Sequence, residues 1–249
     1  SSILCNYFWR ISSIFKCSVE MKKVYFILVF ISSLLGTTKE YSVTLYGIPM
    51  AYISINNKDT IYNDKSAVKL TYHTKTNKIT SSLFRVNNIY ETIIDINTLK
   101  ILSFKKTTFQ PNVTNHLYTT YTNHEVQYND SNTIIPDNCF NIFSLLYYLS
   151  STPFDSIQNI MIVEREGLIY ECKISKSQII DKLELELEFN LINSENNAVI
   201  QHTDIFTWAL FKKGSNNKII INDSEIEACE FKSGFANLKA NIKKKAPHK

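Results

Sequence analysis

Apolar and polar residues alternate along most of the chain, and this period of two constrains its fold more than any other feature. Val68, Leu70 and Tyr72 share one face of a segment whose other face carries Lys69 and Thr71. Successive side chains of a β-strand point to opposite faces of its sheet, so this alternation indicates half-buried strands. The pattern predicts strands at residues 41–46, 67–72, 89–96, 99–109, 116–128, 159–164, 168–174, 183–191, 205–212, 218–221 and 224–231.

Turns between these strands have to be made with little glycine or proline, because the chain has only five of each. Clusters of Asn, Asp, Ser and Lys take their place, since Asn and Asp tolerate left-handed backbone and bond to their own main chain. They predict turns at 56–59, 63–64, 129–132, 193–197 and 214–217. Gly47 and Pro49 predict a tight corner or bulge, because glycine permits unusual backbone and proline removes a ladder donor.

Two segments are predicted to be helical. Residues 79–86 form a short candidate, and residues 139–149 form a stronger one, whose apolar side chains recur at a helical spacing. Asp137 precedes the second helix as its expected N-cap. Many strands and few helices predict a mainly β fold, in which a large curved antiparallel sheet or partial β-barrel carries one or two short helices and a helix covers its apolar face.

The N-terminal part of the sequence is typical of an export signal. After Met21 come Lys22 and Lys23, and then the apolar run 24–31, which is short for a membrane span. We therefore interpret residues 1–20 as a spurious N-terminal extension and residues 21–38 as a signal peptide cleaved near residues 36–38. A single anchor over 3–29 is disfavoured because charged residues interrupt it. We expect a periplasmic or otherwise exported protein that is not integral to the membrane.

The export interpretation leaves a single β-rich domain at 39–242 and a disordered basic tail at 243–249. Residues 1–38 carry four basic residues and one acidic one, so the formal charge of +4 falls to about +1 without them. Most of the remaining positive excess lies in the tail. Nucleic-acid binding needs a basic cluster on one face of a domain, so we expect no nucleic-acid partner.

Several short blocks of the sequence resemble the DUF3108 family of exported bacterial proteins. The blocks occur in the family's order, and the resemblance extends over nearly all of residues 41–242. They are 46–51 (Tyr-Gly-Ile-Pro-Met-Ala), 81–91, 137–149, 207–210 (Thr-Trp-Ala-Leu) and 231–238. The family has no established activity, so the resemblance implies an exported β-rich domain and transfers no catalytic residue.

Candidate catalytic and metal-binding residues are sparse. The five histidines show no spacing typical of a zinc site, and His116 and His124 are too far apart along a predicted strand to share a metal. His202 and Asp204 offer a base and an orienting carboxylate, but the sequence lacks a nucleophile elbow. We therefore expect no catalytic residue, no metal and no cofactor.

Glutamates on the predicted strands suggest an alternative. A row of carboxylates is a feature that a glycosidase could use, which leaves open an envelope hydrolase that acts on glycan or cell-wall material. Alternation of Glu with Leu is also typical of a half-solvated strand, and we favour that interpretation. The residues concerned are Glu164, Glu166, Glu171, Glu184, Glu186 and Glu188.

Three cysteines remain after the signal peptide, namely Cys139, Cys172 and Cys229. An odd number leaves one thiol over if a disulfide forms. Three buried reduced thiols and a single bridge are both open, and a bridge would be expected between Cys172 and Cys229, which lie on predicted C-terminal strands.

Aromatic side chains either fill the core or line an apolar groove. The candidate groove residues are Tyr118, Tyr121, Phe143, Tyr147 and Trp208. We therefore expect a non-enzymatic exported protein that binds a lipid, an acyl chain or a partner protein on a concave β surface. The alternatives to this binding protein are the hydrolase and a purely structural interaction module.

Overall fold

A computed structural model describes residues 37–122, 124–179, 181–192, 198–200, 202–234 and 236–243. The chain divides into two compact units after Thr37. The fold is that of the second unit, Thr38–Lys249, and it also includes Thr37. The interpretations of residues 1–20 and of the signal peptide up to residue 36 lie outside the described residues. So do the turn at 193–197 and the tail from residue 244.

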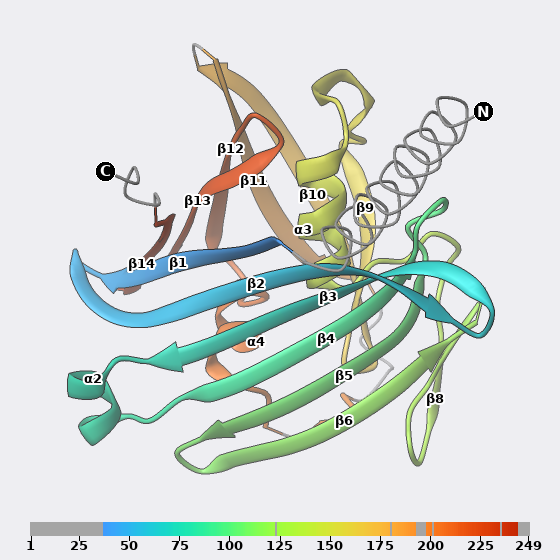
Figure 1. Cartoon of the computed structure of the whole chain (residues 1–249), viewed down its shortest axis with the longest axis horizontal. Coiled ribbons are helices and arrows are strands. Elements are labelled where there is room, and N and C mark those ends of the chain that lie inside the picture. Colours follow the sequence, from blue (N-terminus) through green and yellow to red (C-terminus); the bar gives the residue numbers. More distant parts are fainter. Residues whose placement is uncertain are drawn as a thin grey trace, which may run out of the picture. The chain divides into compact units, whose positions relative to one another are not determined.

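One antiparallel sheet of 14 strands makes up the fold (Figure 1). The strands are β1 (Thr37–Leu45), β2 (Ile48–Tyr62), β3 (Lys65–Thr76), β4 (Asn87–Asp95), β5 (Ile101–Gln110), β6 (Val113–Tyr121), β7 (Glu125–Gln127), β8 (Asn132–Ile134), β9 (Ile160–Arg165), β10 (Leu168–Ile179), β11 (Lys182–Leu191), β12 (Asn216–Asn222), β13 (Glu225–Ser233) and β14 (Ala236–Ile242). The predicted mainly β class with a large antiparallel sheet is confirmed.

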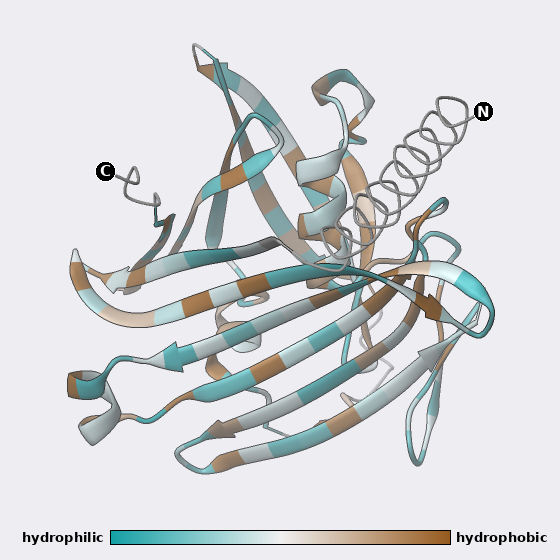
Figure 2. Ribbon diagram, viewed as in Figure 1, coloured by the Kyte–Doolittle hydropathy of each residue, from teal (hydrophilic) through white to brown (hydrophobic). Residues whose placement is uncertain are grey.

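Strands follow one another in the sheet as they do along the chain, with one long-range exception. The order runs from β8 down to β1 and then from β14 down to β9. The exception is the pairing of β1 with β14, which joins the two halves of the chain through registered pairs such as Val43 with Ala240. Hydropathy alternates along the strands in both halves, as Figure 2 shows, so each half has one apolar face.

The sheet is not closed, but among the described residues an isolated bridge links the segment after β8 to the edge strand β9. Phe140 lies between β8 and the next helix, and it pairs in parallel with Val163 of the edge strand β9. The Phe140 N–H donates to Ile162 O at 2.9 Å, and Glu164 N–H donates to Phe140 O at 2.7 Å. These bonds use backbone groups that an edge strand would otherwise leave unpaired.

Three α-helices occur among the described residues: α2 (Lys78–Leu83), α3 (Ile142–Ser151) and α4 (Ile205–Leu210). The helix α3 contacts β3, β4, β9 and β13, so it spans both halves of the sheet. It buries Phe143, Leu145 and Leu149 against their apolar faces.

The predicted N-cap of this helix, Asp137, is wrong. Asn141 caps α3 instead, accepting from Ser144 N at 2.9 Å, while Ser144 Oγ accepts from Asn141 N at 3.0 Å. The physical reason is the bridge at Phe140, because a residue held extended against β9 cannot be part of the helix.

Three further predictions of local structure are corrected. Residues 205–212, predicted as a strand, begin with α4, because Asp204 accepts from Thr207 N and caps a helix there. Residues 56–59, predicted as a turn, lie within β2, where twelve pairs with β3 outweigh the turn preference of their side chains. The predicted strand 116–128 is interrupted between β6 and β7.

Candidate ligand-binding site

An apolar cavity of about 90 Å³ lies between the two halves of the sheet. One wall consists of Ile53 and Ile55 of β2, and another consists of Leu187 of β11 and Ile226 of β13. The helices α3 and α4 contribute further apolar side chains to it. The cavity is therefore built from residues that are far apart in the sequence.

Phe143 of α3 is the centre of the aromatic core beside this cavity. Its ring centroid lies 4.8 Å from that of Tyr72, 4.7 Å from that of Tyr90 and 5.7 Å from that of Phe104. These three partners come from β3, β4 and β5, so one helical side chain packs against three adjacent strands. Phe143 also lines a second, smaller cavity.

A buried ion-pair network lies beyond the aromatic core. The Nζ of Lys106, a residue that is 1% exposed, contacts Glu166 Oε1 and lies 2.6 Å from Asp204 Oδ2. It also donates to Thr203 Oγ1 at 3.1 Å, and that hydroxyl donates to Glu166 Oε1 at 2.9 Å. The network joins β5, the β9–β10 turn and the start of α4.

Asp204 is the most heavily bonded member of the network. It accepts from Tyr90 OH at 2.7 Å and from Thr207 N and Oγ1 at 3.0 and 2.7 Å. Burial raises the pKa of this carboxyl, but the charge of Lys106 and these hydrogen bonds outweigh burial and lower the pKa overall. Asp204 is therefore held ionised, as a buried partner of a buried lysine must be.

Glu164 forms a separate buried contact between the edges of the sheet. It accepts from Tyr121 OH at 2.8 Å, from Gly167 N at 2.8 Å and from Tyr128 OH. Its carboxyl belongs to β9, whereas Tyr121 ends β6 and Tyr128 follows β7. Burial raises the pKa of Glu164, and the three hydrogen bonds only partly offset that rise.

The second cavity, which both carboxylate clusters line, is very small. Glu164, Arg165, Glu166 and Lys106 surround about 20 Å³, which suits one water molecule rather than a substrate. Among the described residues Glu166 Oε2 has no hydrogen-bond partner. The Arg165 guanidinium stacks 5.3 Å from the Tyr170 ring and 5.2 Å from the Phe211 ring. The arrangement stabilises the interior but leaves no room for a glycan.

A larger, polar groove of about 310 Å³ lies beside β9 and the residues that precede α3. Asp137, Cys139 and Gln158 are among its lining residues. Burial raises the pKa of the Cys139 thiol, which therefore stays protonated. An inert thiol gives this groove no nucleophile.

The structure separates the five aromatic residues predicted to bind a ligand. Phe143 lines the apolar cavity, and Tyr121 donates a hydrogen bond to Glu164 beside the small cavity.

The other three residues line neither of these cavities. Tyr118 is 48% exposed, and a hydrogen bond with Tyr62 raises its pKa. Tyr147 packs at the margin of the core, and Trp208 is 49% exposed under the Lys212 ammonium. They do not form one common site.

The predicted corner at Gly47 and Pro49 is a two-residue turn between β1 and β2. Tyr46 and Gly47 have φ values of 50° and 81°, as a type I′ hairpin requires, and Pro49 is the second residue of β2.

Of the two alternatives left open for the cysteines, the bridge between Cys172 and Cys229 is contradicted, because both thiols are free. Cys172 lies on β10 and Cys229 on β13, and two strands separate them in the sheet. Three strand spacings amount to roughly 14 Å, about twice the reach of a disulfide. Burial raises the pKa of each thiol to about 12, which keeps both protonated.

Sequence reasoning missed the buried charges. Lys106 is in phase with Phe104 and Thr108 on the inward face of β5, which is the signal that a charged residue points into the core. Glu164 and Glu166 were assigned to a solvated face, but both are at most 5% exposed. Glu186 and Glu188 do lie on the outer face of β11, as expected.

The described residues contain no group of three His, Cys, Asp or Glu side chains placed to hold a metal ion. None of the described helices has the length and hydropathy of a membrane span.

The comparisons with known proteins agree with this β architecture. A family model described as "Protein of unknown function (DUF3108)" matches residues 40–162. These residues belong to the DUF3108 family. The match begins inside β1, covers β2 to β8, α2 and α3, and ends inside β9. The DUF3108 assignment therefore rests on the first half of the sheet, whereas the resemblance was expected to extend to residue 242.

A solved structure resembles most of the chain in its fold. It is the crystal structure of a beta-barrel-like protein of domain of unknown function DUF1849 from Brucella abortus, with a TM-score of 0.52 and 7% identity. The alignment covers 85% of this chain and 97% of that one. At this identity the likeness shows the fold alone. None of the curated proteins matches the chain.

Proposed function

We propose that this is an exported, non-catalytic binding protein whose sheet encloses an apolar ligand such as a lipid or an acyl chain. The observation that carries the proposal is the apolar cavity between the two halves of the sheet, lined by side chains from β2, β3, β11 and β13. Burial of apolar surface supplies the driving force for such binding.

The size of the cavity limits the ligand. About 90 Å³ is less than the pockets of roughly 300–1,000 Å³ that enclose drug-sized ligands. A narrow hydrocarbon segment fits such a space better than a bulky ring system does. The ligand would therefore enter by the end of a chain and leave its polar end outside the cavity.

Hydrolysis by carboxylates is less well supported. Asp204 and Glu166 are both paired with Lys106, and Glu164 accepts three hydrogen bonds. The space beside them is of the size of one water molecule. A glycosidase needs two carboxyl groups about 5–10 Å apart across an open cleft that admits a sugar.

A partner protein on the concave surface also has less support than a small ligand. The helices α3 and α4 already pack on this face, and α3 contacts strands from both halves of the sheet (Figure 1). A partner would have to displace them. A purely structural role remains the alternative that the binding experiment tests.

Export is proposed from the basic and apolar segments after Met21 alone. If it is correct, protein recovered by osmotic shock from a bacterial host has lost its N-terminal residues and begins near residues 37–39. Intact mass analysis measures this directly, and a cytoplasmic protein that retains Lys22 and Lys23 would contradict it.

A pair of substitutions on one strand tests ligand binding. Thr74 of β3 lines the cavity, whereas Thr71 lies on the opposite face of the same strand. We expect Thr74→Phe to fill the cavity and to abolish co-purification of lipid in native mass spectrometry. Thr71→Phe should retain the same lipid as the unsubstituted protein.

The outcomes separate the alternatives. Lipid in the unsubstituted protein and in Thr71→Phe, but not in Thr74→Phe, supports the cavity as the site. Lipid retained equally by both variants, or no lipid in any of the three proteins, contradicts the proposal. Circular dichroism of both variants checks that the sheet is intact.

A further inference from the structure

Three turns at one end of strands β1–β6 carry a cluster of exposed large apolar side chains. They are the β1–β2 turn, the segment with α2 between β3 and β4, and the β5–β6 turn, which lie together at the left in Figure 1. We call this surface the apolar rim. Its exposed residues, with their exposed fractions, are Tyr46 (62%), Ile48 (63%), Ile79 (82%), Leu83 (88%), Phe84 (37%) and Phe109 (49%).

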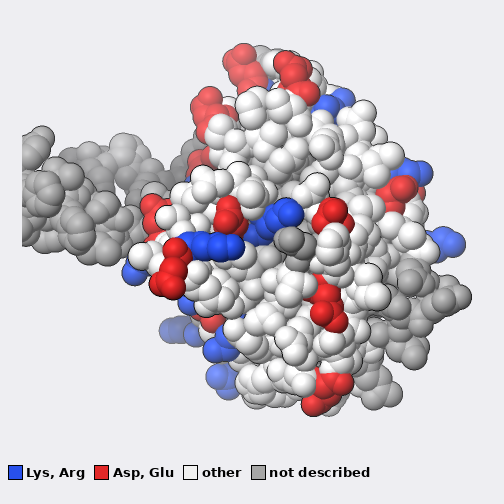
Figure 3. Space-filling model, turned by 90° about the vertical axis from the view of Figure 1, so that its right-hand side faces the viewer, with Lys and Arg blue, Asp and Glu red and all other residues white. Residues whose placement is uncertain are grey.

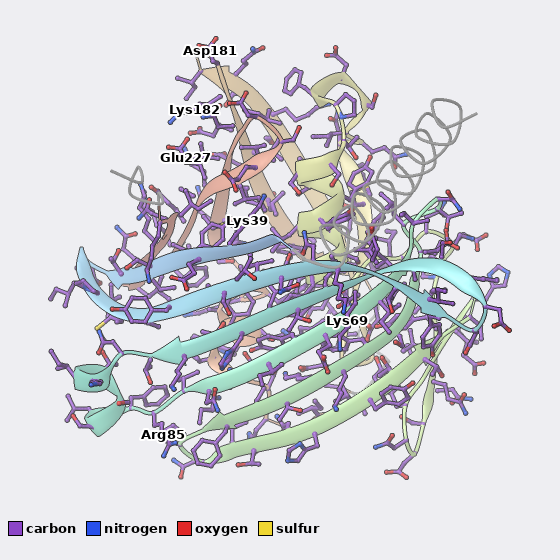
Figure 4. All side chains as sticks on the ribbon, in the orientation of Figure 1. Lys39, Lys69, Arg85, Asp181, Lys182 and Glu227 are labelled. Carbon is purple, nitrogen blue, oxygen red and sulfur yellow. The ribbon has the colours of Figure 1, made fainter. Side chains whose placement is uncertain are left out.

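Direct contacts make these turns one surface. Asn77 donates through its backbone to Met50 O at 2.9 Å and through its side chain to Pro49 O at 2.6 Å, which fixes α2 against the start of β2. Arg85 lies 5.5 Å above the Phe109 ring and so joins the end of the α2 segment to β5. Figure 4 shows Arg85 beside the β5–β6 turn.

The helix α2 presents its apolar side chains outward. Ile79 and Leu83 are four residues apart and lie on the same face of the helix. Buried contacts of α2 are made by Thr80, which donates to Met50 Sδ at 3.7 Å. The inward side of α2 is thus polar and its outward side is apolar, the reverse of a helix that covers a core.

The rim also has a single sign of charge. Residues 43–52, 74–89 and 106–117, which form its three turns and their flanks, contain no Asp or Glu. They contain Lys75, Lys78 and Arg85 as charged groups on the surface and the buried Lys106. On the neighbouring strands across the sheet, Glu230 of β13 is paired with Lys239 of β14.

The opposite end of the same strands differs. Asp64 lies in the β2–β3 turn there, and Asp59 and Asp95 lie near the ends of β2 and β4, together with lysines. Figure 3, which faces that end, shows acidic and basic side chains interspersed. The contrast between the two ends is therefore one of charge sign.

We propose that the apolar rim docks on a bilayer surface that bears anionic headgroups. Exposed apolar and aromatic side chains insert at the boundary between headgroups and acyl chains, and neighbouring lysines and arginines bind anionic lipids. The rim combines both features and lacks the carboxylates that such a surface would repel. This inference is independent of the cavity, which the rim residues do not line.

Vesicle flotation tests the proposal with protein that begins at Thr38, the start of the compact unit that contains the described core. The probes are vesicles of phosphatidylcholine alone and vesicles of phosphatidylcholine with phosphatidylglycerol. We expect the protein to float with the anionic vesicles and to be released by salt, because surface attraction is screened.

Matched variants locate the contact. Ile79→Ser with Leu83→Ser should weaken binding at least about tenfold, and Lys75→Glu with Lys78→Glu should do the same on anionic vesicles only. The control for the apolar variant is Ile61→Ser with Ile134→Ser, because Ile61 and Ile134 lie outside the rim and are 76% and 80% exposed. The control for the charge variant is Lys58→Glu with Lys65→Glu at the opposite end of the strands. Both controls should bind like the unsubstituted protein.

Three results would overturn the inference: no binding to either vesicle, equal binding to both vesicles, or equal losses in the rim variants and their controls. A rim that serves a partner protein instead gives the first of these results.

Discussion

Glu164 shows what a single residue contributes to this fold. It is 3% exposed, and it is the side chain through which the edge strand β9 contacts Tyr121 and Tyr128 near the other edge. A carboxylate in this place is costly to bury, which is why its pKa rises in spite of three donors. The residue therefore makes the stability of the fold depend on pH.

The direction of this dependence follows from the raised pKa. In the unfolded chain Glu164 titrates near its ordinary value of 4.5, and in the folded protein it titrates higher. Between these two values the folded state binds more protons, so the free energy of unfolding falls as pH rises through that window, by at most about 1.4 kcal/mol per pH unit. Glu164→Gln should remove this part of the slope, because its amide does not titrate.

Urea unfolding at a series of pH values measures the effect. The matched control is Glu188→Gln on the outer face of β11, which should keep the slope of the unsubstituted protein. A slope that persists in Glu164→Gln would show that other groups cause it.

At the same scale, the sequence shows why the buried charges were missed. Alternation with a period of two places every second residue of a strand on the same face. It predicts Lys106 on the inward face of β5 only if burial of a lysine in the core is accepted. What makes that position tolerable is the pairing with Glu166 and Asp204, which are 60 and 98 residues further along the chain. Such partners cannot be read from local pattern.

At the scale of elements, most strands and both expected helical regions were predictable from alternation and spacing, and their failures have local causes. The residues of α4 were predicted to belong to a strand, but Asp204 caps a helix because its side chain accepts from Thr207 N. The Asn and Asp residues of β2 look like a turn, but pairing along the whole of β3 keeps them extended. In both cases a hydrogen-bond partner overrides propensity.

The start of α3 allows a test at this scale. Asn141 is 4% exposed, caps the helix and donates to Thr92 Oγ1 at 3.1 Å. Asn141→Ala removes the cap and leaves a buried hydroxyl with one partner fewer, so we expect a loss of about 2–3 kcal/mol in the free energy of unfolding.

Urea unfolding also measures this change. The control is Asn216→Ala at the exposed start of β12, which should change the free energy by less than about 0.5 kcal/mol. Equal losses in the two variants would contradict the assigned role of the cap.

At the scale of the whole molecule, a large antiparallel sheet was predictable but its closure was not. Alternation predicts strands, and short turns predict that successive strands pair. Nothing local predicts that β1 pairs with β14 or that Phe140 bridges to β9, and these two contacts bring together the walls of the cavity. The candidate site is thus a product of long-range topology, and of the five predicted residues Phe143 alone lines the apolar cavity.

The central claim is that the space between the two halves of the sheet binds an apolar chain. Titration of a fluorescent fatty acid into the delipidated protein tests this most directly, with Thr74→Phe and Thr71→Phe as the matched pair. We predict saturable binding to the unsubstituted protein and to Thr71→Phe, and at least a tenfold weaker affinity for Thr74→Phe, in which the ring occupies the cavity. Equal affinity in the two variants, or no saturable binding to the unsubstituted protein, would contradict the claim.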